Sequence, residues 1–265
     1  MIWTARFAAV AALTLAAAPA LADGAARAAP SEGPEGERRW MFHVDWGPVK
    51  LADVEIRVTA EDGRVELAGA GRSVGLAAMV ADFEVSQRSV YVDGRRRYEA
   101  TARWDDRDSR RRVRWDGAPQ DGARPSVEVA STDPRPLTPI PSEALAGTVD
   151  PAFPVWDTLR RIERGGDCGA RYAVYDGVRR FDLILEDRGR ETLERDRDWT
   201  WGGEARVCRL KFERVGGFPE DAERETEESE YERLLYIGEV DGAPTPVRLR
   251  VQWPLGYATA RIELN

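Results

Sequence analysis

Apolar and polar residues alternate along most of the chain from residue 40 onwards. The first run extends from Trp40 to Trp46 and the second from Val54 to Val58. Alternation with a period of two puts apolar side chains on one face of a β-strand and polar side chains on the other. The pattern recurs in Tyr98–Trp104, Phe181–Leu185, Cys208–Phe212, Val247–Trp253 and Ala258–Leu264. We therefore expect a mostly β protein built from half-buried strands.

Asp-Gly pairs separate many of these runs. Glycine readily adopts the positive φ that two-residue hairpin turns require, so each pair predicts a tight antiparallel hairpin. Because each strand keeps one polar face, we expect a single antiparallel sheet curled around its own core, in a rolled or half-barrel architecture. The pairs are Asp62-Gly63, Asp93-Gly94, Asp116-Gly117, Asp176-Gly177 and Asp241-Gly242.

One segment changes to helical spacing. Asp150 followed by Pro151 is typical of a helix start, and apolar residues then recur at helical spacing from Phe153 to Ile162. We expect a helix near residues 151–164 that plugs the open mouth of the sheet.

Two other segments depart from the alternation. Residues 75–82 predict a further short helix, and the four prolines of residues 131–141 predict an extended connector between the two halves of the sheet. We expect residues 39–265 to form a single domain.

The N-terminus has the features of a signal peptide. A charged start, an apolar run and an Ala-x-Ala site predict cleavage after Ala22. The apolar run of about a dozen residues is too short to cross ~30 Å of hydrocarbon. We expect an exported, periplasmic protein that is not integral to the membrane, with residues 23–38 as a disordered lead-in.

The chain has two cysteines, Cys168 and Cys208. An even number in an exported protein favours a disulfide between them. Redox catalysis is disfavoured because the two are not in a C-x-x-C arrangement, and a metal site would need two further ligands.

Charge and histidine content restrict the possible functions. The formal net charge of -8 argues against nucleic acid as a partner, because binding by phosphate neutralisation needs excess Lys and Arg. A single histidine, His43, leaves few ligands for a metal, and we expect neither a metal nor a cofactor. His43 and Asp45 share a strand face. They form either a polar pair on the outer face or a carboxylate-oriented imidazole.

Arginine is concentrated in one region. Residues 95–114 hold nine arginines and four acids, whereas residues 220–232 hold eight acids and one arginine. The positive patch is offset either by the acidic segment or by an anionic ligand or lipid head group. Several tryptophans on predicted strands either pack in the core or line a ligand groove. The candidate ligand or partner surface consists of Trp46, Trp104, Trp115, Arg110, Arg111 and Arg112.

Several segments together resemble a known family. They are FHVDWGPVKLADVEIRV, GTVDPAFPVWDTLR, CGARYAVYDGVRRFDLIL, VCRLKFERVGGF and LGYATARIEL. In this order they resemble the bacterial exported family catalogued only as domain of unknown function 3108. The resemblance implies a periplasmic, mostly antiparallel β protein of rolled form, with no established activity and no catalytic residues to carry over.

These observations favour a non-catalytic envelope protein. We expect its curved sheet to bind a hydrophobic or amphipathic, lipid-like ligand, or a component of the cell envelope. The alternatives are a hydrolase that uses carboxylates and His43, and a purely structural envelope factor. An apolar pocket of roughly 300 Å³ or more on the concave face favours ligand binding, and a filled face favours a structural role.

Overall fold

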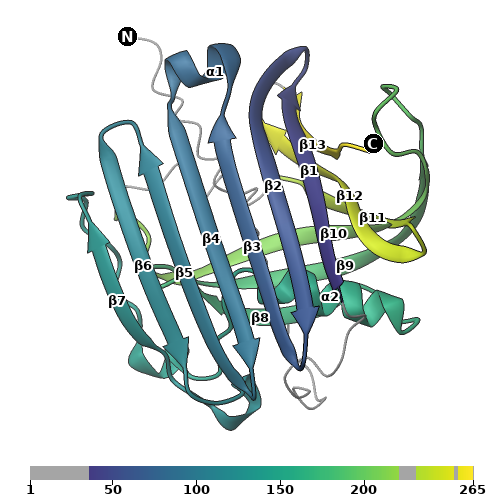
Figure 1. The fold of residues 1–265 in the computed structure, drawn as a ribbon. Coiled ribbons are helices and arrows are strands. Elements are labelled where there is room, and N and C mark those ends of the chain that lie inside the picture. Colours follow the sequence, from purple (N-terminus) through teal and green to yellow (C-terminus); the bar gives the residue numbers. More distant parts are fainter. Residues whose placement is uncertain (1–35, 221–230, 254–255, 265) are drawn as a thin grey trace.

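The computed structural model describes residues 36–220, 231–253 and 256–264, which form one antiparallel sheet of thirteen strands that does not close (Figure 1). This confirms the predicted fold class. The strands are β1 Gly36–Trp46, β2 Val49–Glu61, β3 Arg64–Ser73, β4 Phe83–Val92, β5 Arg95–Trp104, β6 Arg107–Trp115, β7 Ser126–Ser131, β8 Ala170–Tyr175, β9 Arg180–Leu193, β10 Gly203–Gly216, β11 Arg233–Val240, β12 Ala243–Trp253 and β13 Gly256–Ile262.

Sheet order follows chain order within each half. The order is β7-β6-β5-β4-β3-β2-β1-β13-β12-β11-β10-β9-β8, so the first and last strands meet in the middle and β7 and β8 are the edges. β1 begins at Gly36, three residues before the expected start of the domain, because Gly36–Arg38 pair with the end of β2. The predicted signal peptide lies outside the described residues and stays a prediction.

Three of the five Asp-Gly pairs, Asp62-Gly63, Asp93-Gly94 and Asp241-Gly242, form the two-residue turns that the sequence predicts. Asp176-Gly177 lies in a four-residue hairpin loop between Tyr175 and Arg180. Asp62, Asp93 and Asp241 themselves adopt positive φ, as type I′ turns require. The prediction for Asp116-Gly117 is wrong: this pair opens a longer loop with a 3-10 turn at Pro119–Asp121 before β7. The β5–β6 hairpin instead turns at Asp105, which has a φ of 53°.

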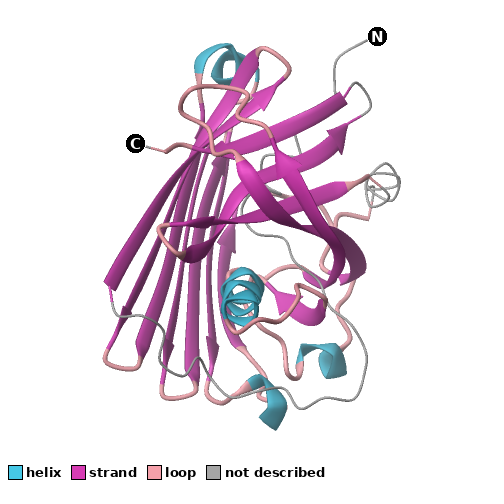
Figure 2. Ribbon diagram, turned by 90° about the vertical axis from the view of Figure 1, so that its right-hand side faces the viewer, coloured by secondary structure: helices cyan, strands magenta, loops and turns pink. Residues whose placement is uncertain are grey.

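The sheet folds over on itself into two layers. Strands β1–β7 form the first layer, and the strands of β8–β13 run across it at a large angle (Figure 1). The helix α2, Phe153–Glu163, lies between the layers, as the view along its axis shows (Figure 2). This matches the predicted plugging helix. A second helix, α1 at Gly75–Val80, joins β3 to β4, and a 3-10 turn at Ser142–Leu145 precedes α2.

A buried carboxylate anchors the start of α2. Asp150 has no solvent exposure and accepts hydrogen bonds from the backbone N–H groups of Ala152 and Phe153. It also accepts bonds of 2.7 and 2.8 Å from the Ser89 and Tyr91 hydroxyls on β4. Asp150 therefore holds the segment that leads into the helix and ties it to the first layer, whereas the N-cap itself is Ala152, two residues after the predicted position.

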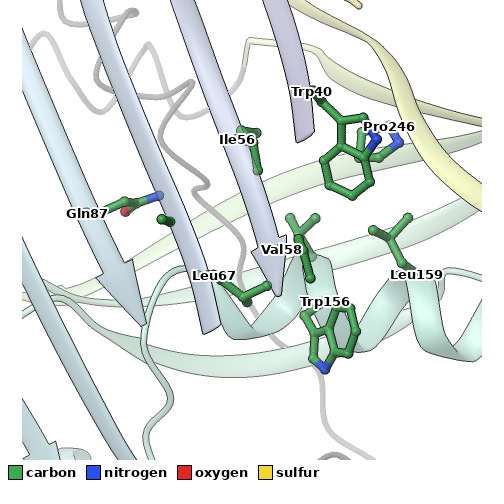
Figure 3. A pocket seen from close by; sticks show the side chains of 11 residues that line it. Trp40, Ile56, Val58, Leu67, Gln87, Trp156, Leu159 and Pro246 are labelled. Atoms are coloured by element: carbon green, nitrogen blue, oxygen red, sulfur yellow. The ribbon is translucent and has the colours of Figure 1, made fainter. Parts of the chain in front are cut away.

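The concave face is filled with side chains where it covers α2. Trp40, Val58 and Leu67 from the sheet meet Trp156 and Leu159 from the helix, and the space left among them is only about 30 Å³ (Figure 3). A water needs about 10–15 Å³ of such space, so there is room for no more than about two waters. This half of the concave face is therefore core.

A disulfide joins Cys168 to Cys208, as the sequence predicts. It connects the residues before β8 to β10, and both cysteines are fully buried. The Cα atoms are 6.1 Å apart, within the usual range for a disulfide.

Candidate functional site: a pocket on the concave face

Beyond α2 the concave face is open. A pocket of about 430 Å³ lies between the inner face of β4–β7 and an opposite wall made by the Pro-rich connector and the residues at 178–179 and 217–219. Small-molecule sites usually enclose about 300–1,000 Å³. The concave face therefore combines a filled half, over α2, with a half that leaves room for a ligand.

The pocket has an extensive apolar lining. Trp104 is held in place by Phe83, whose ring stacks on it at 5.3 Å. Val129 and Leu137 are 46% and 42% exposed, so large apolar side chains face the open space instead of the core. Phe218 completes the opposite wall. These groups suit the apolar part of a ligand.

Local sequence explains how the opposite wall is built. Thr138 N–H donates to the carbonyl of Phe218 at 2.7 Å, and Gly217 N–H donates to the carbonyl of Thr138 at 2.8 Å. Leu137 forms a β-bridge with Pro219. The close approach depends on Gly217, which has a φ of +80° and where a Cβ would overlap the carbonyl oxygen of Val178. Only glycine tolerates both conditions.

Four arginines also line the pocket, in two pairs that each share an aspartate. Arg111 and Arg179 contact the Oδ2 atom of Asp176 at 2.6 and 2.7 Å. In the second pair, Arg135 and Arg107 lie 2.6 and 3.7 Å from the Oδ2 atom of Asp133. Asp108 also lines the pocket.

The arginines keep both shared aspartates charged. Burial by itself raises the pKa of Asp176, but Arg111, Arg179 and two backbone N–H groups outweigh it and hold the pKa well below its usual value. The hydrogen bond from Arg135 is the main reason that the pKa of Asp133 falls to about 2. Asp133 and Asp176 are therefore both negatively charged at neutral pH.

The structure brings together only two of the six residues in the predicted ligand surface. Trp104 and Arg111 line the pocket. Arg110 and Arg112 are exposed on the outer face of β6, because side chains alternate along a strand. Trp115 is completely buried and donates its indole N–H to Thr148.

Trp46, the sixth predicted residue, lies at the end of β1, where it packs half-buried against the core. It does not line the pocket, because β1 belongs to the filled half of the concave face.

Carboxylates on neighbouring strands balance much of the positive charge of the arginine-rich region. Neither of the two predicted alternatives, the acidic segment or an anionic ligand, included these carboxylates. Arg112 lies 3.8 and 3.7 Å from Glu99 and Glu128 on the adjacent strands. Arg96 is buried, with its guanidinium 5.0 Å above the Trp115 ring. Most of the acidic segment, residues 221–230, lies outside the described residues.

His43 faces away from the pocket and does not pair with Asp45. Its Nδ1 atom lies 2.5 Å from Asp53, directly across on β2, and its Nε2 atom lies 3.2 Å from Glu263. Residues directly opposite on paired strands are closer than residues two apart on one strand, which explains the difference. Asp45 contacts Arg197 and Arg261 instead.

Sequence reasoning missed the pocket residues that come from outside the sheet layer, namely Arg135, Leu137, Arg179 and Phe218. Their proximity depends on how the connector crosses the molecule. The one available signal was the Gly216-Gly217 pair, which marks a point of close backbone approach.

The fold and the pocket define a class of protein: a rolled, open antiparallel sheet with an internal helix and a pocket on its concave face. The chain belongs to the family described as protein of unknown function DUF3108, whose model matches residues 41–263. This confirms the resemblance seen in the sequence. A search of curated proteins finds no match.

One solved structure is similar in fold. It is the "Crystal Structure of Beta-barrel-like Protein of Domain of Unknown Function DUF1849 from Brucella abortus", with a TM-score of 0.50 and 10% sequence identity. The match covers 86% of this chain and 95% of that one. At this identity the likeness concerns the fold alone. Among the described residues, no helix combines the length and the apolar character that crossing a membrane requires.

Proposed function

We propose that this protein is an exported, non-catalytic binding protein for an amphipathic ligand with an acidic head group. The observation that carries the proposal is the concave pocket of about 430 Å³, which has exposed apolar side chains and two arginine pairs in its lining. This volume lies within the range of about 300–1,000 Å³ that is usual for small-molecule sites. It suits a ligand with a chain of moderate length.

The charge distribution supports an anionic head group. Four guanidinium groups line the pocket, and an incoming carboxylate or phosphate can accept charge-assisted hydrogen bonds from their N–H groups. A cationic head group would instead approach these four positively charged side chains. The apolar chain would lie along Trp104, Val129 and Phe218.

The predicted signal peptide and the disulfide support an extracytoplasmic location. Disulfides persist in oxidising compartments such as the periplasm. We therefore place the proposed binding activity in the cell envelope, where amphipathic molecules are abundant.

Filling the pocket should abolish binding without unfolding the protein. The probe is 1-anilinonaphthalene-8-sulfonate, which combines apolar rings with an anionic group and fluoresces in apolar sites. Ala102 lies on the inner face of β5 and lines the pocket, so Ala102→Trp places an indole in the space that the probe needs. We expect binding at least about tenfold weaker, because the cavity loses much of its volume.

The matched control is Ala70→Trp, the same substitution on the exposed outer face of β3. It should leave the affinity for the probe unchanged. Near-UV circular dichroism must stay native in both variants, because this probe also binds loosely packed states. Equal binding by the wild type and the folded Ala102→Trp variant would refute the proposal that the pocket is the ligand site.

A further inference from the structure

The two edges of the sheet differ in how they are covered. At β8, Val149 forms a bridge with Val174 and exchanges backbone hydrogen bonds with Ala173 and Tyr175. At β7 no other described strand pairs with the outer side. β7 is therefore the open edge of the sheet.

The alternation of hydrogen-bonded and non-bonded residue pairs between β6 and β7 shows which backbone N–H and C=O groups of β7 point outward. Thr132 N–H donates to the carbonyl of Asp108 at 2.9 Å, which extends the β6–β7 ladder and fixes its alternation. Hydrogen-bonded and non-bonded pairs alternate in an antiparallel ladder. The backbone groups of Val127, Val129 and Ser131 therefore point away from β6, and they bond to no other segment of the described chain.

β7 lacks several of the features that usually prevent edge pairing, although it is short and carries one charged residue, Glu128. Its sequence, SVEVAS, contains no proline or lysine, the β6–β7 register is regular, and all six residues are exposed. Edge strands that avoid partners usually carry such interruptions. Alternate β-branched residues also favour an extended strand.

We propose that β7 pairs with β7 of a second copy of this chain, antiparallel about a two-fold axis, with Val129 opposite Val129 of the second copy. In this register the outward-pointing groups of Val127, Val129 and Ser131 all find partners. Shifting the centre to Glu128 would place two glutamates directly opposite each other, which is unfavourable. The proposed register puts Glu128 opposite Ala130 instead.

Charge complementarity favours a second copy as the occupant. Arg110 lies directly across from Ala130 on β6, is exposed and makes no ion pair with the described residues. In the proposed register, Glu128 of the second copy lies opposite Ala130. Because the side chain of Ala130 is small, the next side chain that Glu128 of the second copy can reach on this face is Arg110. The backbones are then about 10 Å apart, across two strand spacings, which the two long side chains span together. Symmetry gives this ion pair twice.

The contact is short, so the dimer belongs with weak, transient interfaces. In the dimer, the inner faces of the two sheets would be continuous across the paired β7 strands. This junction lies beside the pocket, because Val129 and Ser131 line the pocket. The dimer itself does not depend on the proposed ligand.

Sedimentation velocity over a range of protein concentrations tests the dimer. We expect Arg110→Glu to weaken dimerisation by about five- to tenfold, because the changed charge acts at two symmetric positions. Adding Glu128→Arg should restore it. The matched control is Arg97→Glu, an exposed arginine on the outer face of β5 that makes no described ion pair and lies away from the edge. It should have no effect, and Arg110→Glu and Arg97→Glu should keep the wild-type melting temperature, whereas Glu128→Arg also removes the ion pairs of Glu128 with Arg112 and Arg114 of its own chain.

Cross-linking tests the register. Val129→Cys should form an intermolecular disulfide under mild oxidation, whereas Ala130→Cys should not, because Ala130 faces residue 128 of the second copy. A chain that stays monomeric at millimolar concentration would overturn the proposal. So would a dimer that Arg110→Glu does not weaken, or one in which Ala130→Cys cross-links better than Val129→Cys.

Discussion

Asp176→Asn is expected to lower the free energy of unfolding by about 2–4 kcal/mol. Removing one partner of a buried ion pair costs about 3–5 kcal/mol, and the partial exposure of Arg111 and Arg179 reduces that cost. Asp176 is only 2% exposed and joins β6 to the β8–β9 turn through Arg111. Urea unfolding at neutral pH measures the loss. The matched control is Asp167→Asn, which removes an exposed ion pair with Arg161 and should cost less than about 1 kcal/mol.

The pH dependence gives a second readout of the same residue. The folded-state pKa of Asp176 is depressed, so its contribution to stability is fully present above the unfolded-state pKa of about 3.9 and is lost as the pH falls below it. The stability difference between wild type and Asp176→Asn should therefore shrink as the pH falls from about 5 towards 2. A difference that stays constant over this range would show that the charge of Asp176 does not stabilise the fold.

Removal of the disulfide is the other large effect that we expect. The Cys168–Cys208 bond closes a loop with a sequence separation of 40. In the chain-entropy model, a loop of this size contributes about 4 kcal/mol by constraining the unfolded chain. The double variant Cys168→Ala/Cys208→Ala should lose up to this amount in urea unfolding.

A reducing agent provides the internal control for the disulfide. It should lower the stability of the wild type towards that of the double variant, and it should leave the double variant unchanged. If the wild type keeps its full stability after both thiols have become titratable, the bond contributes nothing to the fold.

Local patterns predicted most of the fold because the physical causes are local. Alternating residues such as Tyr98 to Trp104 define strands, and Asp-Gly pairs such as Asp93-Gly94 define hairpins, whatever the rest of the chain does. Asp150 and the apolar spacing that follows it predicted α2. Its link to Ser89 and Tyr91 could not be predicted, because those residues are distant in sequence.

The pocket was predicted only in outline. Arg111 has the same parity along β6 as the buried residues Val113 and Trp115, and this pattern alone places it on the inner face, away from Arg110 and Arg112. The sequence analysis grouped Arg110, Arg111 and Arg112 as one surface and therefore did not separate the inner-facing arginine from the two outer-facing ones. The opposite wall depends on how the connector crosses the molecule, which strand periodicity does not encode.

The measurement that tests the central claim most directly compares ligands that share a chain and differ in the head group. Dodecyl phosphate, dodecanol and dodecyltrimethylammonium, each below its micelle concentration, compete with the bound fluorescent probe. We predict that the phosphate binds best and the ammonium worst, and that the preference shrinks in the double variant Arg107→Gln/Arg135→Gln. Equal affinities for the three, or tightest binding of the ammonium, would contradict the proposal that the concave pocket binds acidic amphipathic ligands.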